Sequence, residues 1–247
     1  MSFHKMLNLS LILLLSLTGC ATSPIAPKSA ETYFKEGEEF YASRQYEDAI
    51  AQWKKVKDSY TSPELTTLAE LKIADAHFEN ANYIEAAAAY EDFRKLHPNH
   101  EKAPFALFRL GMCNYVQIGR IDTDQTPVKN AAAMFEQFLK QYPNSEYAAE
   151  VKEKLAVCHQ KQVQYEIYVG RFYLRTEKYQ ASIKRLEEAL AKFPKSPLHD
   201  ETLLYLGEAY MLAGEKEKGR DIFNRLFKGY PESRFVNDAR KFMGKYY

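Results

Sequence analysis

The chain has 247 residues, of which 34 are Lys or Arg and 33 are Asp or Glu, so its formal net charge is +1. This balance lacks the basic excess with which proteins bind nucleic-acid backbones. With 46% hydrophobic and 14% aromatic residues, the chain is also too apolar to be disordered and can bury a substantial core. We therefore expect a folded protein that does not bind nucleic acid.

The first expected element is an N-terminal targeting segment. After a weakly basic start, an apolar run covers residues 6–17, which is shorter than the roughly 20 residues that span a bilayer as a helix. The run therefore favours a secretory signal. A Leu-x-Gly-Cys sequence follows at 17–20 and resembles the lipobox of bacterial lipoproteins. The resemblance implies a signal peptide over 1–19 and lipidation of Cys20, and the alternative is an ordinary signal peptide with an incidental cysteine.

The residues after Cys20 indicate where the anchor would lie. Residue 21 is Ala rather than Asp, which by the lipoprotein sorting rule implies transport to the outer membrane, held by palmitate-type acyl chains. Residues 20–30 contain Pro and Ser without helical periodicity, so we expect a lipidated tether there. Loss of the signal also removes Lys5, which would leave the mature chain formally neutral.

From residue 31 onward, apolar residues recur at i, i+3, i+4 and i+7 without sustained alternation, which predicts an all-α fold. A sequence pattern also recurs: a small residue in a first helix, a large apolar residue in a second helix, and a Pro after the second helix. This resembles the tetratricopeptide repeat, a superhelix of helix pairs in which small residues allow close approach and Pro stops the second helix. Five copies can be followed, with the small residues Gly37, Ala74, Gly111, Gly170 and Gly207 and the large residues Trp53, Tyr90, Phe135, Leu186 and Phe223.

The spacing between copies predicts a seam after the third repeat. Gly111 and Gly170 are 59 residues apart, where three other intervals are 37. We assign the excess to a polar loop around 119–129 and to a lengthened helix over about 145–176, with Ser145 as its N-cap. The expected division is therefore repeats one to three over 31–144, then the long bridging helix, repeats four and five and a cap helix (233–246) over 145–247.

The sequence carries no motif of a hydrolase, a phosphate-binding loop or a dinucleotide-binding fold. His97 and His100 flank a Pro-Asn turn without an acidic or Cys partner nearby, so a solvated turn is favoured over a zinc site. We expect neither enzyme activity nor a metal or cofactor. Cys113 and Cys158 could bridge in an oxidising compartment, but their apolar-face positions favour buried free thiols.

The remaining candidate is a recognition surface on the first helices of the early repeats. Repeated aromatic and apolar side chains along the inner groove of such an array suit an extended or C-terminal peptide that has aromatic residues of its own. The alternative is that these positions pack one repeat on the next. Arg109 and Lys72 are candidates for meeting a ligand carboxylate. The candidate groove residues are Phe34, Tyr41, Leu71, Phe78, Phe108 and Tyr115.

The order of lipobox, tether, five repeats, insertion and long helix, together with the phrases at 142–147 and 168–173, resembles the BamD family of outer-membrane β-barrel assembly lipoproteins. The resemblance implies a non-enzymatic subunit of the BAM complex on the periplasmic face of the outer membrane of a Gram-negative bacterium. Implied partners are the POTRA domain of a BamA-like barrel subunit, unfolded outer-membrane proteins and accessory BAM lipoproteins. Arg185 matches the family arginine that pairs with a POTRA acid, and the alternative is a helix-surface pair with Glu188.

A second functional class is also compatible with a lipid-anchored repeat protein. Tetratricopeptide lipoproteins of the cell envelope also act as scaffolds for peptidoglycan synthesis or Tol-Pal coordination. That variety carries an N-terminal coiled-coil heptad region, and its absence here favours the barrel-assembly interpretation.

Overall fold

The computed structural model describes residues 28–59 and 61–246, so the predicted signal peptide, Cys20 and most of the tether lie outside the described residues. The described chain is helical throughout and contains no strand. Ser29 caps the first helix through its side-chain oxygen, so the last residue of the predicted tether, Ala30, is already helical and buried. The helices are α2 (Ala30–Ala42), α3 (Tyr46–Ser59), α4 (Pro63–Glu79), α5 (Tyr83–Leu96), α6 (Ala103–Tyr115), α7 (Thr126–Gln141), α8 (Ala148–Arg175), α9 (Tyr179–Lys192), α10 (His199–Leu212), α11 (Lys216–Gly229) and α12 (Phe235–Tyr246).

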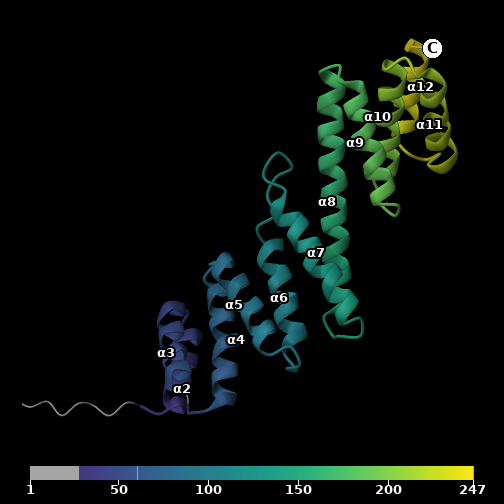
Figure 1. The fold of residues 1–247 in the computed structure, drawn as a ribbon. Coiled ribbons are helices and arrows are strands. Elements are labelled where there is room, and N and C mark those ends of the chain that lie inside the picture. The colour runs from purple at the N-terminus through teal and green to yellow at the C-terminus, as the bar shows by residue number, and fades with distance from the viewer. Residues whose placement is uncertain (1–27, 60, 247) are drawn as a thin grey trace, which may run out of the picture.

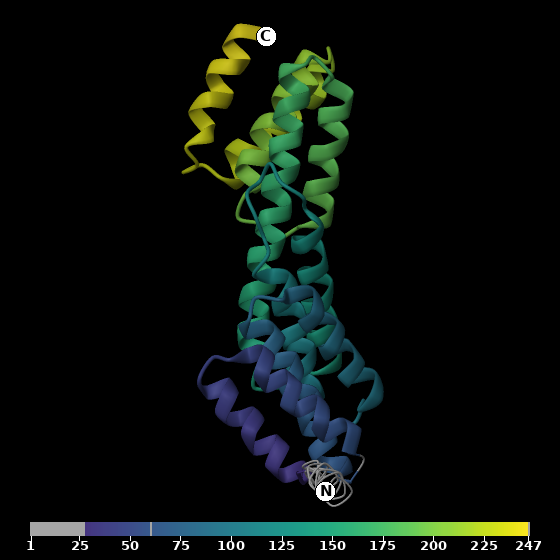
Figure 2. The same ribbon diagram turned by 90° about the vertical axis from the view of Figure 1, so that its left-hand side faces the viewer.

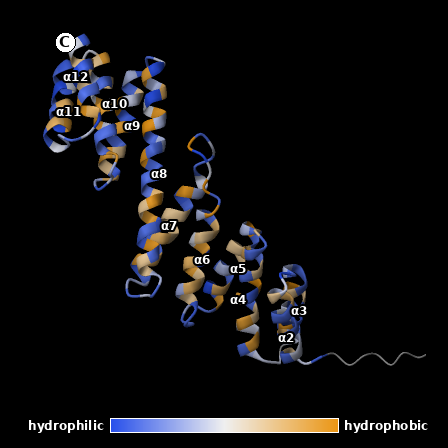
Figure 3. Cartoon of the chain, turned by 180° about the vertical axis from the view of Figure 1, so that it is seen from behind, coloured by the Kyte–Doolittle hydropathy of each residue, from blue (hydrophilic) through white to orange (hydrophobic). Residues whose placement is uncertain are grey.

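The helices form antiparallel hairpins that stack in chain order. Each helix from α2 to α11 packs against the next, and Figure 1 shows the resulting stack of helices, with α2 at one end and α12 at the other. The view turned by 90° shows that the array is elongated, with its two ends far apart (Figure 2). Along the chain, hydrophobic residues are interleaved with hydrophilic ones in every helix (Figure 3). The predicted all-α tetratricopeptide-repeat fold is confirmed. Within the described residues, no helix is both long and apolar enough to cross a membrane.

The close packing inside each hairpin rests on the small residue of the first helix. Four of these residues are glycines, and a Cβ atom added to any of them would lie closer than 3.0 Å to the large side chain of the second helix. Those side chains are themselves fully buried, so they have little room to move. The small and large residues of the recurring sequence pattern are therefore in contact across the two helices of a repeat. The pairs are Gly37 with Trp53, Gly111 with Phe135, Gly170 with Leu186, and Gly207 with Phe223.

The long helix is present and unbroken, as the absence of Gly and Pro from 146 to 169 predicts, but it begins three residues later than expected. α8 runs from Ala148 to Arg175. Ser145 is not its N-cap: the Ser145 carbonyl accepts from Ala148 N at 2.9 Å, and its hydroxyl accepts from Tyr147 N at 3.4 Å. These bonds hold residues 142–147 in turns, and the first α-helical bond runs from Val151 N to the Tyr147 carbonyl.

The inserted loop is shorter than predicted because α7 begins inside it. Pro127 lies in the first turn of α7, where its missing N–H costs no helical hydrogen bond. Asp124 stabilises the start of α7, because its carboxylate accepts hydrogen bonds from the backbone N–H of Thr126 at 2.9 Å and from the Thr126 hydroxyl at 2.8 Å. The loop proper therefore ends at Gln125 rather than at Lys129.

Among the residues that the structure describes, the buried side chains form three clusters, and α8 contributes to two of them. One cluster lies within α2, α3 and α4, a second extends from α4 into α8, and a third extends from α8 to α12. On α8 the second cluster ends at Cys158 and the third begins at Val163. Cys113 and Cys158 are free and buried, as predicted, and burial raises the pKa of the Cys113 thiol to about 12 and that of Cys158 to about 11.

The cap helix α12 begins at Phe235 instead of Ser233. The Ser233 hydroxyl donates to the Asp200 carboxylate at 2.6 Å and accepts from Phe235 N, which fixes the turn that leads into α12. α12 packs against α10, and there the burial of Glu208, together with the negative charge of Asp238, raises the pKa of Glu208 to about 7. The last contact of the array therefore contains a carboxyl group that folding favours in its protonated form.

We expect Glu208→Gln to stabilise the protein at pH 8 and to change little at pH 5. The pKa of Glu208 is raised in the folded state from an ordinary 4.5, so its ionisation between about pH 4.5 and 7 opposes folding, and the free energy of unfolding falls across that interval. Because ~1 kcal/mol moves the melting temperature by ~2–4 °C in a chain of this size, thermal unfolding should show a gain of a few degrees at pH 8. Glu232→Gln, at an exposed position, is the control and should show no such pH-dependent gain.

Candidate functional site

Two of the six candidate groove residues belong to the core. Leu71 is 7% exposed and Phe108 is 8% exposed, and both lie in the cluster that extends from α4 to α8. The Phe108 ring stacks on Tyr147 with centroids 5.1 Å apart and an interplanar angle of 11°. For these two positions, the packing alternative describes the side chains: they hold one repeat on the next.

The other four candidates are half-buried aromatic residues that face the second helix of their own repeat. The rings of Phe34 and Tyr41 lie 6.4 Å and 5.8 Å from the ring of Trp53. Such edge and tilted contacts leave one part of each ring on solvent, so these side chains combine a structural contact with an accessible aromatic surface. In the next two repeats, Phe78 lies 5.3 Å from Tyr83 and Tyr115 lies 5.9 Å from Phe135.

The two candidate cations of this region, Arg109 and Lys72, already have carboxylate partners within the protein. Arg109 Nη2 lies 2.9 Å from Glu79 Oε1, and its guanidinium carbon lies 3.7 Å from the centre of the Phe78 ring. Lys72 Nζ lies 3.0 Å from Glu38 Oε1. A ligand carboxylate at this surface would therefore compete with Glu79 and Glu38 for these cations.

A network of polar side chains holds Arg109 in position. The Tyr90 hydroxyl donates to the Asp75 carboxylate and accepts from Arg109 Nε at 3.0 Å. Burial raises the pKa of Asp75, and burial with the nearby charges of Asp75 and Glu79 raises the pKa of Tyr41 to about 12. The Tyr41 hydroxyl therefore remains a protonated hydrogen-bond donor even well above physiological pH.

Arg185 lies on α9 and is paired across the hairpin with α8. Its Nη1 atom donates to Glu166 Oε2 at 3.2 Å, with 42% of the Arg185 side chain exposed. The ion pair of Arg185 is therefore with Glu166 on the neighbouring helix, and not with Glu188 on its own helix, which was the alternative from the sequence. A guanidinium group carries five N–H donors, so one bond to Glu166 leaves the others for a further partner.

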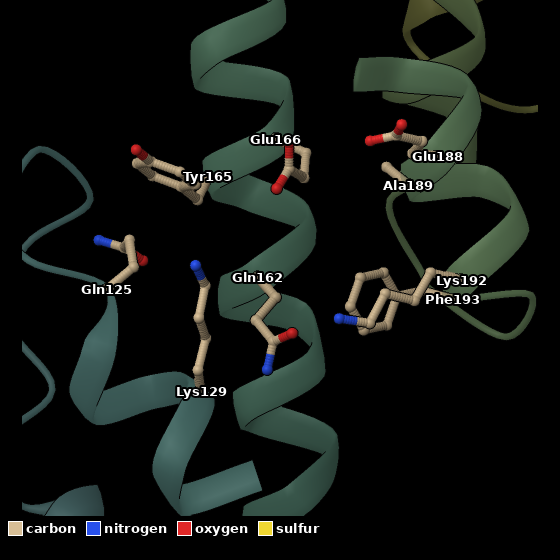
Figure 4. Close-up of a pocket in the computed structure, with 9 residues that line it drawn as sticks. All are labelled: Gln125, Lys129, Gln162, Tyr165, Glu166, Glu188, Ala189, Lys192 and Phe193. Carbon is tan, nitrogen blue, oxygen red and sulfur yellow. The ribbon is translucent and has the colours of Figure 1, made fainter. Parts of the chain in front are cut away.

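A cleft of about 190 Å³ adjoins this ion pair, at the seam between the third and fourth repeats. Figure 4 shows Gln125 and Lys129 of the α7 start, Tyr165 and Glu166 of α8, and Lys192 of α9 around it. Polar atoms of both signs line the cleft, which suits recognition of a polar side chain more than a purely apolar one.

Within the described part of the chain, no group of three His, Cys, Asp or Glu residues is placed to hold a metal ion. His97 instead lies 2.7 Å from Glu70 through its Nε2 atom, and Lys57 Nζ approaches the same carboxylate at 3.3 Å. The turn at 97–100 is thus held by the hydrogen bond between His97 and Glu70, and the ion pair of Glu70 with Lys57 joins α4 to α3 beside it.

Comparison with known protein families identifies the chain. The family described as outer membrane lipoprotein, YfiO, matches residues 26–222, which covers the first four repeats and the fifth as far as the middle of α11. The chain belongs to this family. The family assignment confirms the resemblance inferred from the lipobox, the repeats and the long helix, and it places the chain among non-enzymatic proteins, as predicted.

The YfiO family assignment agrees with relatives of similar length. The outer membrane protein assembly factor BamD of Rickettsia prowazekii is 27% identical over 251 residues, covering 100% of this chain and 99% of the relative. The protein of the same name from Vibrio cholerae is 28% identical and covers 85% of this chain and 92% of the relative. Among solved structures, the TPR2AB-domain:pHSP90 complex of yeast Sti1 gives a TM-score of 0.42 with 13% identity, over 84% of this chain and 80% of that one.

The sequence did not reveal the acidic partners of the candidate cations. Glu166 is 19 residues before Arg185, and Glu79 is 30 residues before Arg109. The only available signal is the repeat itself: residues on the first and second helices of one hairpin face each other when their spacing matches the hairpin, as Gly170 and Leu186 do. That spacing alone does not identify Glu166, which precedes Arg185 by 19 residues, whereas Gly170 precedes Leu186 by 16.

Proposed function

We propose that this member of the YfiO family is an outer membrane protein assembly factor, a lipoprotein subunit of the BAM complex. The observation that carries the proposal is the match of the family to residues 26–222, joined by full-length relatives that are named assembly factor BamD. The repeat array supports it physically, since it offers two separate surfaces on one scaffold: the aromatic side chains of the first three repeats and the Arg185 region of the fourth.

The lipid anchor proposed at Cys20 would hold the array close to the inner leaflet of the outer membrane. Only about ten residues separate Cys20 from the start of α2 at Ala30. A fully extended chain spans at most ~3.6 Å per residue, so the first repeat would lie within ~36 Å of the acyl chains. The N-terminal repeats would therefore meet unfolded clients near the membrane, on its periplasmic face.

The C-terminal repeats are the proposed site for the POTRA domain of a BamA-like barrel subunit, with Arg185 as the contact residue. The partial exposure of the Arg185 side chain and the N–H donors not used by Glu166 support this role, because bidentate recognition of a carboxylate requires two adjacent donors. Accessory BAM lipoproteins are further partners under this proposal.

The N-terminal repeats are the proposed site for unfolded outer-membrane proteins, through Phe34, Tyr41, Phe78 and Tyr115. We expect Tyr41→Ala with Phe78→Ala to weaken binding of a peptide that copies the aromatic C-terminal segment of a barrel protein by at least about 30-fold. Truncated aromatic anchors at interfaces typically cost ~2 kcal/mol or more each. Fluorescence anisotropy with the labelled peptide measures the change.

The matched control for this pair is Tyr168→Ala with Phe172→Ala, which removes two aromatic rings that are 43% and 48% exposed on α8. The control should bind the peptide as wild type does. Equal affinity of the Tyr41/Phe78 variant and wild type would show that the two rings serve packing alone. Circular dichroism checks that both variants keep their helices.

Affinity purification from solubilised outer membranes tests the function as a whole. We expect a POTRA-containing barrel subunit to be recovered with the protein. Recovery of peptidoglycan synthases or Tol components without any POTRA-containing protein would contradict the proposal and favour an envelope scaffold instead.

A further inference from the structure

A second hollow of about 610 Å³ lies on the seam, next to the cleft beside Arg185, and the site described above does not use it. It is formed by the end of α7, the middle of α8 and the connection from α9 to α10. The two hollows share Lys192 and Phe193 as lining residues, so they lie on either side of one wall. We name the larger hollow the seam groove.

The floor of the seam groove is apolar and is contributed by both halves of the array. Leu139 of α7 and Leu155 of α8 are partly buried residues packed against the cluster that extends from α4 to α8. Phe193 belongs to the cluster that extends from α8 to α12, and Pro194 and Pro197 follow it in the same wall. A ligand in this groove would therefore contact both cores at once.

The rim of the groove is basic. Lys152, Lys192, Lys195 and His159 line it, and no Asp or Glu is among its lining residues in the described chain. Lys192 lies against the Phe193 ring, 5.2 Å from its centre, and no ion pair with a described residue is found for Lys152 or Lys195. Two acids lie at the margins: Glu136 lies 3.1 Å from His159, and Glu188 lines the neighbouring cleft. Three ammonium groups over an apolar floor favour an occupant with carboxylates and apolar side chains.

The dimensions fit a short stretch of extended polypeptide. Lys152 and His159 are seven residues apart on α8, which is ~10 Å along the helix axis. An extended chain rises ~3.3 Å per residue, so this interval matches about three residues. The groove volume also lies in the range of ~300–1,000 Å³ that is usual for ligand sites. In an extended segment, alternate side chains point to opposite faces, so apolar residues can reach the floor while acidic ones reach the rim.

We propose that the seam groove is a docking site for an extended segment of a partner polypeptide in which acidic and apolar residues alternate. The segment bridges the two halves of the array, with its apolar side chains against Leu155 and Phe193 and its carboxylates on Lys152 and Lys195. Occupation would fix the N-terminal repeats relative to the C-terminal repeats. The proposal does not depend on Arg185 or on the aromatic residues of the first three repeats.

A charge-swap binding experiment tests this site with the full-length protein in detergent. The probe is a fluorescein-labelled, acetylated and amidated peptide of alternating Glu and Leu, and its partner probe carries Lys in place of Glu. We expect saturable anisotropy binding of the Glu/Leu peptide that weakens as salt is raised. Lys152→Glu with Lys195→Glu should lose at least about tenfold in affinity for the Glu/Leu peptide and gain affinity for the Lys/Leu peptide.

Two further variants separate a local site from general charge and from misfolding. Lys228→Glu with Lys241→Glu makes the same change of net charge at exposed positions of α11 and α12, and it should bind the Glu/Leu peptide as wild type does. Ala156→Trp fills the groove from an exposed position of α8 without changing charge, and it should abolish binding.

Three outcomes would overturn the proposal. They are no saturable binding of the Glu/Leu peptide, equal binding of the Lys/Leu peptide by wild type, or the same loss in the distant double variant. Circular dichroism checks that the charge-swapped variant keeps its helices, so that its loss of Glu/Leu binding is not the result of misfolding. Co-purification of the barrel subunit, tested above, is independent of all three.

Discussion

Arg185→Glu is expected to abolish binding to the POTRA domain of the barrel subunit while the helical circular dichroism signal stays unchanged. The variant removes the donors that would meet a POTRA carboxylate and introduces a like charge opposite it. It also sets a second carboxylate against Glu166, the present partner of Arg185 at 3.2 Å. Losing one member of a close interfacial charge pair typically costs ~2–5 kcal/mol, which is a loss of about 30-fold to 5,000-fold in affinity.

The matched control is Lys184→Glu, which makes the same change of charge one residue earlier on an exposed face of α9. It should weaken binding by no more than a few-fold, through the rate of association. Glu166→Gln frees the guanidinium from its internal partner and should bind the POTRA domain at least as tightly as wild type does. Surface plasmon resonance with an immobilised POTRA domain measures all three. Equal losses for Lys184→Glu and Arg185→Glu would refute the assignment of Arg185 as the contact residue.

Gly207→Ala and Gly244→Ala are expected to change stability in opposite directions, although both place Ala for Gly within a helix. A Cβ at Gly207 would lie closer than 3.0 Å to the ring of Phe223, which is fully buried and cannot withdraw without disturbing its neighbours. Overpacking of this kind typically costs ~1–3 kcal/mol. At Gly244 of α12, no atom lies within 4 Å of the added Cβ, so the higher helix propensity of Ala should stabilise the chain by up to ~1 kcal/mol.

Urea unfolding followed by circular dichroism measures both glycine variants, with the slope of the transition compared between them. Equal changes in the free energy of unfolding for Gly207→Ala and Gly244→Ala would contradict this expectation. They would show that the close approach of α10 and α11 does not require the absence of a Cβ atom at residue 207. Ala74 stands at the equivalent place of the second repeat beside the fully buried Tyr90, so there the hairpin already accommodates a methyl group.

The repeat landmarks and the long helix were predictable because each depends on a short stretch of chain. Gly207 and Phe223 meet since their spacing matches one hairpin, and the same spacing recurs through the array. α8 is continuous because no residue from 146 to 169 is Gly or Pro. The start of α8 was misplaced because Ser145 uses its hydroxyl and carbonyl within a turn, and a turn competes with a capping bond for the same atoms.

The candidate site was less predictable because it depends on contacts between helices that the repeat periodicity does not specify. Phe108 was expected on the inner surface, yet it stacks on Tyr147, which belongs to the irregular turns before α8. Arg185 was placed correctly on α9, but its partner Glu166 depends on how α8 and α9 cross. The seam groove arises where three separate elements meet, and its basic rim combines residues from two of them.

The sharing of α8 between two buried clusters has a thermodynamic consequence. In a repeat array each unit is stabilised mainly by its nearest neighbours, so unfolding can proceed in sections. Here the cluster that ends at Cys158 and the cluster that begins at Val163 are joined through one turn of a single helix. The cooperativity of unfolding between the two halves therefore depends on that turn, and a substitution that frays it would separate one melting transition into two.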